Sequence, residues 1–594
     1  MKNVVAEITS ILSPNTMAAQ IAQMWDNLSM NRRTWLDEKK ELQEYIFATD
    51  TTKTAVGTLP WKNKTTLPKL CQIRDNLHAN YLSALFPNDD WMKWEAHSDD
   101  GAVVQKRKAI TGYLANKLRE SNFRTEISKL LYDYIDYGNA FYDVVWVSDS
   151  AIDAETGETI PGYTGPKLVR ISPNDIVFNI LASDFDHTYK ITRYIKTMGE
   201  LRSELDNRPE LRYNASIVEK AEEMRKQLGS YTPEDLNKAS QICIDGFGQF
   251  SDYLQSNYVE LLEFEGSIHD ANTGELLKNV IITVVDRLHV IRVVPMPSWL
   301  GKSTKGHVSW RQRPDNIYGM GPLDNLVGMQ YRIDHLENLK ADAMDLAVHP
   351  PLAISGNVEE FRWEPGAEIF VGEGGSIVEL GKNLNGVMAA NNEIAVLEQK
   401  MEEMAGAPKQ AMGIRTPGEK TAFEVQTLEM AASRIFQNKI THFEVNLIEP
   451  ALNRMLELAR RNMDGTDLIR VMDDDIGVAE FLSITKEDIT ASGKIRPIGA
   501  RHFAAQATMV QNLMGMVNSG LWQDQGVRVH FSGKAIAKMV EEVLGLEKFA
   551  LYQENAQVFE AVETSQMQSQ GQEEVAVTNM TPPEGMPMPQ GGMM

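Results

Sequence analysis

Residues 322–351 read PLDNLVGMQYRIDHLENLKADAMDLAVHPP, and this stretch decides the predicted fold. Its first apolar residues step by 3, 4 and 3, the spacing of one helical face: Leu326, Met329, Ile333 and Leu336. Pro322 suits the first turn of a helix, and Pro350 ends the pattern because the residue before a proline disfavours helical geometry. The stretch therefore predicts a long helix whose apolar seam packs against another helix.

The residues after this helix predict its partner. Short apolar runs with Gly and Pro turns over 352–380 predict a small β unit, and a second helix is expected from Val387 to Met404. A loop then leads to Lys420, and a long helix from Thr421 should kink at Pro450. The plan is helix, β unit, helix, loop and long kinked helix.

The flanks complete a predicted α+β fold that is predominantly α-helical. Helices are expected over 16–48, from Pro68 to Phe86 and over 102–137, and mixed α/β structure over 140–300. Residues 466–490 resemble strands and 500–560 helices, whereas the final stretch is rich in Gln, Met, Pro and Gly and should be disordered. Trp61, Trp91 and Trp94 are predicted to be core or interface residues, because their surroundings lack the basic groove that stacks single strands.

Composition narrows the class of protein. The 594 residues include 59 basic and 82 acidic ones, a formal net charge of −23, with 43% hydrophobic residues. This is globular composition, and two distant cysteines, Cys71 and Cys243, indicate a reducing compartment rather than a disulfide framework. No apolar run is long enough to cross a membrane, and the acidity argues against tight wrapping of a nucleic acid.

The chemical motifs are weak. Gly301-Lys302-Ser303 resembles a phosphate loop, but Met296 stands where that loop needs a glycine. Asp184, Asp186 and His187 form a possible but isolated cation trio, and Asp473–Asp475 are expected in a solvated turn. We therefore expect no catalytic residues, no metal and no cofactor, and we predict that the chain is not an enzyme.

Charge is unevenly distributed along the central plan. Residues 322–406 hold 15 acidic and 5 basic residues, whereas 407–420 reverse the sign with Lys409, Arg415 and Lys420 against Glu419. Counting alone would also fit a solvated helical hairpin.

Five short stretches, in order along the chain, resemble one family. They are Leu82-Ser83-Ala84-Leu85-Phe86-Pro87 with Trp91-Met92, Tyr137-Gly138-Asn139-Ala140, Tyr318-Gly319 with Gly321-Pro322-Leu323, Arg415-Thr416 through Glu424-Val425, and Ala491-Ser492-Gly493 with Ile498-Gly499-Ala500. Together with the helix plan they resemble bacteriophage portal proteins, the head-to-tail connectors of short-tailed, podovirus-type phages.

The resemblance implies a portal fold of wing, stem, clip and crown, assembled as a ring. It divides the chain into an N-terminal helical segment 1–49, a wing 50–321, a first stem helix 322–348, a clip 349–385, a second stem helix 386–406, a tunnel loop 407–420, a long wing helix with a β segment 421–500, crown helices 501–560 and a tail 561–594. The ring would hold about twelve copies with head-to-tail interfaces.

The resemblance also implies a function, partners and a location. The ring would sit at one capsid vertex of the virion, after assembly in the host cytoplasm, and double-stranded DNA would be packaged and ejected through it. A packaging terminase would dock first and tail or adaptor proteins later, beside the major capsid protein and without a membrane. The alternatives are a non-portal virion or scaffold protein and a nucleic-acid-processing enzyme.

Three sets of residues are predicted to carry this function. The DNA-facing tunnel loop would present Lys409, Arg415 and Lys420, although Arg415 and Lys420 could instead pair only with Glu419 or a neighbouring subunit. An acidic stem would repel phosphates and let the duplex slide; its candidates are Asp334, Glu337, Asp342, Asp345, Glu398, Glu402 and Glu403. The clip aromatics would either anchor docking proteins or seal neighbouring clips: Phe361, Trp363 and Phe370.

Overall fold

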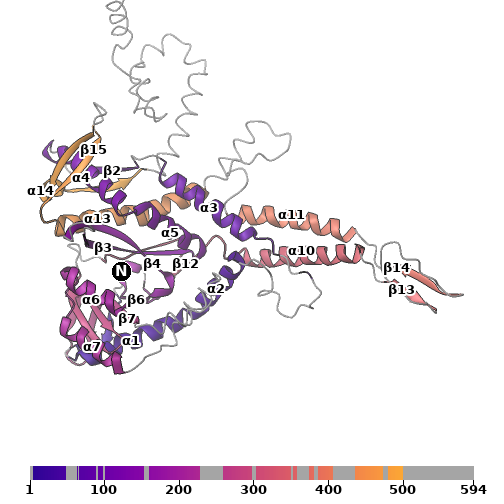
Figure 1. Ribbon diagram of the computed structural model, residues 1–594, viewed down its shortest axis with the longest axis horizontal. Coiled ribbons are helices and arrows are strands. Elements are labelled where there is room, and N and C mark those ends of the chain that lie inside the picture. Colours follow the sequence, from indigo (N-terminus) through magenta and orange to yellow (C-terminus); the bar gives the residue numbers. More distant parts are fainter. Residues whose placement is uncertain are drawn as a thin grey trace, which may run out of the picture. The chain divides into compact units, whose positions relative to one another are not determined.

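The computed structural model divides the chain into two compact units, Met1–Val471 with Phe481–Arg501, and Met472–Glu480 with His502–Met594. The structure describes residues 4–11, 13–47, 63, 66–87, 91–97, 101–152, 159–182, 184–227, 258–296, 303–348, 352–356, 374–379, 385–405, 435–472 and 479–498. Nearly all of these belong to the first unit, whose fold mixes helices with several sheets (Figure 1). The α+β class predicted from the sequence is thereby confirmed, and the predicted crown and tail lie outside the described residues.

The N-terminal helical region contains two helices where the sequence predicted one over 16–48. Helix α1 spans Pro14–Asn31 and α2 spans Arg33–Phe47, and they are separated at Arg32. The buried Arg32 guanidinium donates hydrogen bonds to the carbonyl oxygens of Pro173, Asn174 and Ile176. These partners lie more than a hundred residues away, so helical periodicity does not reveal the contacts made at the break.

A six-stranded sheet packs against α1. Its main path runs β5-β6-β7-β8-β9, with β1 added in parallel to β7. The strands are β1 (Ala6–Ile8), β5 (Ile176–Phe178), β6 (Lys190–Thr197), β7 (Tyr258–Asp270), β8 (Leu276–Val285) and β9 (His289–Pro295). Leu262 and Phe264 of β7 pack in the cluster that contains α1, whereas Val259 and Leu261 pack with α6 (Met198–Asn207) and α7 (Ala215–Gln227). Alternate side chains of β7 therefore pack on opposite faces of the sheet, and helices cover both faces.

A second sheet has the order β10-β3-β4, with β3 at Asn139–Ile152, β4 at Thr159–Ile171 and β10 at Gly306–Ser309. The largest hydrophobic cluster combines residues of β3 with α3 (Lys69–Leu85), α4 (Gly101–Glu120), α5 (Phe123–Asp136) and α13 (Glu449–Asn462). The cluster includes Trp91 and Trp94, which are 6% and 1% exposed, so their predicted place in a core is confirmed.

Smaller strand pairs complete the described fold. They are β2 (Met92–Ala96) with β17 (Gly493–Pro497), β11 (Arg311–Arg313) with β12 (Asn316–Met320), β13 (Leu352–Ser355) with β14 (Ser376–Glu379), and β15 (Thr466–Met472) with β16 (Ala479–Thr485), while a short helix α14 spans Lys486–Ile489.

A buried group of charges lies beside the two larger sheets. Lys305 Nζ, just before β10, is 2.6 Å from Glu263 Oε1 and 3.4 Å from Glu265 Oε2, both on β7. Burial would raise the pKa of Glu263, but the nearby cations Lys305 and Arg292 hold it below its usual value. Asp143 on β3 is also buried, and burial raises its pKa to about 6, although the nearby Lys305 opposes this shift. Charge pairing thus compensates part of the cost of burying these groups.

Two of the stretches quoted from the sequence meet in the fold. Gly138 has a φ of +69°, and a Cβ there would lie 2.2 Å from the backbone nitrogen of Gly321. Next to this contact, the Asn139 side chain donates to the carbonyl of Gly319 at 3.1 Å and accepts from its N–H at 2.8 Å. Only glycine meets both the left-handed conformation and this close approach.

The central plan forms a helical hairpin. Helix α10 spans Val327–Val348 and α11 spans Asn385–Ala405, and the β13–β14 pair lies between them in the chain (Figure 1). The helix predicted from Pro322 begins at Val327, because residues 323–326 form a tight turn closed by Leu326 N–H to the Leu323 carbonyl at 2.9 Å.

The long helix is irregular at Pro450, where the sequence predicted a kink. Residues Glu444–Ile448 form a π-helical turn, η4, and α13 follows directly from Glu449. A proline lacks the N–H that would bond to the preceding turn, and this missing bond accounts for the local change of helix type. The predicted start of this helix at Thr421 lies outside the described residues.

Candidate functional site

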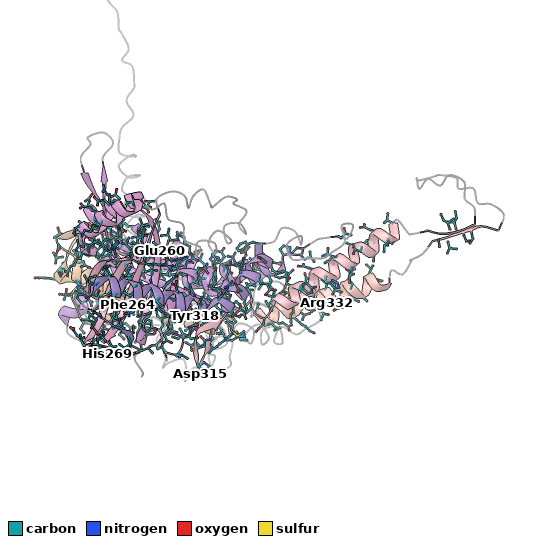
Figure 2. The ribbon with its side chains drawn as sticks, turned by 90° about the horizontal axis from the view of Figure 1, so that it is seen from below. Glu260, Phe264, His269, Asp315, Tyr318 and Arg332 are labelled. Carbon is teal, nitrogen blue, oxygen red and sulfur yellow. The ribbon has the colours of Figure 1, made fainter. Side chains whose placement is uncertain are left out.

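The α10–α11 hairpin is the part of the described chain that matches the expected stem. Its helices have 22 and 21 residues, which corresponds to lengths of about 33 and 31 Å. Apolar side chains bury the seam near the base of the hairpin: Ile333, Leu336, Ile394, Met401 and Ala405. The predicted seam of α10 therefore meets a partner helix, and the two run side by side in both views (Figures 1 and 2).

The hairpin also exposes an unusual share of apolar surface. Of the seventeen large hydrophobic side chains that are exposed in the described chain, ten lie between Tyr331 and Met404. They are Tyr331, Leu339, Met344, Leu346, Val348, Ile354, Val378, Met388, Val396 and Met404. Eight of the ten lie on the two helices and two, Ile354 and Val378, on the β13–β14 pair; exposed apolar surface is typical of interaction sites.

One ridge of α10 carries much of this surface. Tyr331, His335, Leu339 and Leu346 follow each other at spacings of 4, 4 and 7, so they share one face. The rings of Tyr331 and His335 are parallel, with centroids 6.4 Å apart. None of these four side chains is a carboxylate, but Asp342, three residues after Leu339, falls on the same face, so an acid borders the apolar side chains of this ridge.

Two predicted stem acids are used inside the chain. Asp334 is 5% exposed, and its Oδ1 accepts from Leu67 N–H at 3.0 Å and from Gln330 Nε2 at 2.9 Å. Burial raises the pKa of Asp334 to about 6, although these hydrogen bonds oppose the shift. Glu402 is 4% exposed and lies 2.7 Å from Lys69 Nζ. Neither carboxylate points freely into solvent within the subunit.

The other five predicted acids are more accessible, and most have local partners. Asp342 and Asp345 accept hydrogen bonds from Asn63 at 2.9 and 2.8 Å. Glu337 pairs with Lys340 at 2.5 Å, Glu403 accepts from Gln399 at 3.0 Å, and Glu398 is half-buried. That these residues line a channel stays a prediction.

The remaining predicted site residues lie outside the described residues. These are the tunnel-loop candidates Lys409, Arg415 and Lys420 and the clip candidates Phe361, Trp363 and Phe370. Sequence reasoning overlooked Asn63, Lys69 and Gln330. Only Gln330 gave a signal, because it is a polar residue next to Met329 in the predicted apolar seam.

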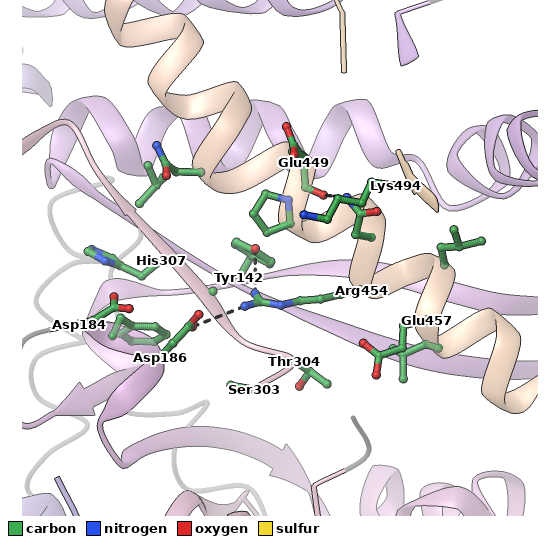
Figure 3. Close-up of a pocket in the computed structure, with 18 of the residues that line it drawn as sticks. Tyr142, Asp184, Asp186, Ser303, Thr304, His307, Glu449, Arg454, Glu457 and Lys494 are labelled. Carbon is green, nitrogen blue, oxygen red and sulfur yellow. Dashed lines mark hydrogen bonds and ion pairs between the residues drawn. The ribbon is translucent and has the colours of Figure 1, made fainter. Parts of the chain in front are cut away.

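A polar cavity of about 730 Å³ lies elsewhere in the first unit, lined by β3, β10, α13 and the start of β17 (Figure 3). At its centre, Arg454 donates to Tyr142 Oη at 2.9 Å and pairs with Asp186 at 3.5 Å. His307 also lines it, and burial together with Lys190 lowers the pKa of this imidazole to about 3. The ring is therefore neutral, and its Nε2–H donates to Asn139 Oδ1 at 3.0 Å.

In the described residues, the weak chemical motifs of the sequence are not brought together into a site. Asp184 lies 3.4 Å from His187 while Asp186 turns to Arg454, and within the described ranges no group of three or more His, Cys, Asp or Glu side chains is placed to hold a metal ion. Ser303 is buried and its Oγ accepts from Lys305 N–H at 3.0 Å, whereas the two residues before it and Asp473–Asp475 are outside the described residues. Every helix in the described ranges is too short or too polar to span a membrane.

Comparison with known families gives one match. Residues 307–467, just over a quarter of the chain, match the model of bacteriophage head to tail connecting proteins. This region contains the whole α10–α11 hairpin together with α13. The match supports a relationship to phage connectors, and its description names no tail type, so the short-tailed type stays a prediction. No curated protein matches the chain.

Proposed function

We propose that this protein is a subunit of a ring-shaped phage head-to-tail connector, in which α10–α11 hairpins of neighbouring copies pack together around a channel. The proposal rests first on the family match, which covers the hairpin and both of its flanks. A connector of this kind would contact capsid and tail proteins and would be part of the virion.

The observation that best supports assembly into a ring is the exposed apolar surface of the hairpin. Tyr331, Leu339 and Leu346 on α10 are 57%, 45% and 48% exposed, and Met388 and Val396 on α11 are 70% and 51% exposed. These side chains lie on both helices of the hairpin, and in the ring each helix would meet a different neighbouring copy. Contacts between different surfaces are head-to-tail, and they generate closed rings when the rotation closes.

The more specific part of the proposal rests on the resemblance of the sequence to phage portal proteins. Double-stranded DNA would pass through the channel during packaging and ejection, a terminase would dock during packaging, and tail or adaptor proteins would replace it. The protein would have no catalytic activity, and the work of packaging would come from the terminase. Lys409, Arg415 and Lys420 would touch phosphates weakly, because exposed ion pairs contribute roughly 1 kcal/mol or less each.

A second candidate is a virion or scaffold protein that assembles without a channel. The same exposed apolar surface would serve open or irregular assemblies, since a head-to-tail contact whose rotation does not close gives a filament. The shape of the assembly separates the two candidates.

The experiment combines the mass of the purified full chain with negative-stain images of two charge-insertion variants. Leu339→Glu places a charge on the exposed ridge of α10, and Leu181→Glu is the matched control because Leu181 is 85% exposed away from the hairpin. We expect rings from the wild type and from Leu181→Glu, and single subunits from Leu339→Glu. Rings of unchanged yield from Leu339→Glu would refute the role of the hairpin.

A further inference from the structure

A short segment before α3 is bound along the polar side of α10. The backbone N–H of Asn63 donates to Asp342 Oδ1 at 2.9 Å, and its side-chain amide donates to Asp345 Oδ2 at 2.8 Å. Nearer the base, Leu67 N–H donates to Asp334 Oδ1 at 3.0 Å. Three acids of one helix thus bind donors from a segment more than 260 residues earlier in the chain.

Gln330 completes this side of α10. Its Nε2 donates to the carbonyl of Leu67 at 2.5 Å and to Asp334 Oδ1 at 2.9 Å, while its Oε1 accepts from Leu70 N–H at 3.2 Å. The side chain is fully buried, so each of these bonds compensates for water that the amide has lost. The buried Gln330 side chain therefore connects α10 to residues 67–70 through specific hydrogen bonds.

The first residue of α3, Lys69, also contacts the second helix of the hairpin. Lys69 Nζ lies 2.7 Å from Glu402 Oε1 of α11 and 3.1 Å from Gln72 Oε1. Both side chains of the ion pair are nearly buried, at 7% and 6% exposure. Residues 67–70 therefore touch α10 and α11 at once.

The spacing of the contacts fits a segment that lies along the helix axis. At about 100° per residue, Gln330, Asp334, Asp345 and Asp342 fall within roughly 120° of each other around α10. Asp334 and Asp342 are about 12 Å apart along the axis, and they accept from Leu67 and Asn63 respectively. The contacts are therefore spread along α10 and not gathered at one point.

We propose that Asn63, Leu67, Lys69 and Leu70 form a clasp that fixes the angle at which the α10–α11 hairpin leaves the first unit, and that opening the clasp frees the hairpin to pivot. The acids of α10 on this side are then an intramolecular docking surface rather than a surface for DNA or a neighbouring copy. In a ring, which this step takes from the proposed function, the angle would set the width of the channel.

The first test measures amide exchange in the full chain. The Leu67 and Leu70 N–H groups report the clasp directly, since both donate to α10 side chains. Gln330→Ala should speed their exchange at least tenfold. Asn63→Ala removes the side-chain bonds of the outer contact and keeps the backbone bond to Asp342, so it should speed the exchange a few-fold and cannot unfold the buried seam. Glu337→Gln is the matched control, because Glu337 pairs with Lys340 on α10 itself. Unchanged exchange in both clasp variants would overturn the proposal.

The second test measures the pivot. Spin labels at Met388, 70% exposed on α11, and at Leu181, 85% exposed on the body of the first unit, report one distance. Labelled subunits are diluted with unlabelled ones so that only the distance within one subunit is read. We expect a narrow distribution in the wild type and in Glu337→Gln, and a clearly broader one in Asn63→Ala and Gln330→Ala. An equally narrow distribution in all four proteins would show that the segment does not set the angle.

Both readouts are independent of assembly. A clasp that behaves as expected in a protein that forms no rings would refute the proposed ring and leave the clasp standing. Rings with unaltered exchange and an unaltered distance distribution in the clasp variants would refute the clasp alone.

Discussion

Replacing Lys69 with methionine should loosen the base of the hairpin, because Glu402 would stay buried without its cation. The Lys69–Glu402 pair is 2.7 Å long, and both side chains are less than a tenth exposed. Removing one partner of a buried ion pair costs about 3–5 kcal/mol. Glu402 has a further interaction in the fold, so we expect the lower end, about 3 kcal/mol, which corresponds to a roughly hundredfold larger open population of α3 and α11.

Hydrogen exchange of the slowest amides in α3 and α11 measures this opening directly, without assuming that a chain of this size unfolds in one step. Two comparisons isolate the charge. Lys69→Met combined with Glu402→Gln should recover most of the loss, because a neutral amide is far less costly to bury than a carboxylate. Arg332→Met breaks the pair with Glu393, which is 3.1 Å long but 47% and 46% exposed, and should cost at most about 1 kcal/mol (Figure 2). Equal losses from Lys69→Met and Arg332→Met, or no recovery in the double variant, would refute the reasoning.

Three further outcomes follow from the same structure. Gly138→Ala should lower the thermal midpoint markedly, at a cost of about 2 kcal/mol or more, because the new Cβ would lie 2.2 Å from backbone. Gly274 has a similar φ of +73° but open space around it, so Gly274→Ala should cost only about 1 kcal/mol. Equal shifts of the two variants would contradict the close-contact argument. Burial raises the pKa of Asp334 from 3.8 to about 6, so its contribution to stability is complete below about pH 4 and is lost as the pH rises through about 6. Asp334→Asn should therefore gain up to about 3 kcal/mol relative to the wild type between pH 3 and pH 8 in denaturant titrations, and a constant difference would refute this. Lys305→Met should destabilise the first unit by several kcal/mol at pH 7 and less at pH 5, because burial raises the pKa of Glu263 once this cation is gone and so favours its protonated form. A thermal shift that grows on acidification would contradict the buried pairing.

Periodicity anticipated the elements of this fold better than their ends and contacts. The steps from Leu326 to Leu336 predicted α10 and its apolar seam, because burial against one partner helix leaves a local pattern. The break between α1 and α2 was missed, since Arg32 is held by carbonyls of residues 173–176 and no neighbouring residue encodes that. The domain boundaries drawn from the resemblance stay predictions.

For the functional surface too, the sequence revealed local patterns but not long-range contacts. Counting acids along the stem identified charged residues but not their partners, and the partners decide what a charge does. Asp334 and Glu402 are buried in contacts with Leu67 and Lys69, which lie far away in the sequence. The exposed ridge through Leu339 was overlooked, because exposure of an apolar residue depends on which side of α10 the rest of the chain covers.

The central claim is that many copies of this chain close into a ring through their hairpins, and imaging the purified full-length protein tests it most directly. Class averages of particles of known mass should show annuli with a hole about 20 Å or wider, enough for a duplex whose grooves alone are about 6 and 12 Å across. Particles that remain single subunits at every protein concentration and salt condition, or that join only into open filaments, would contradict the account.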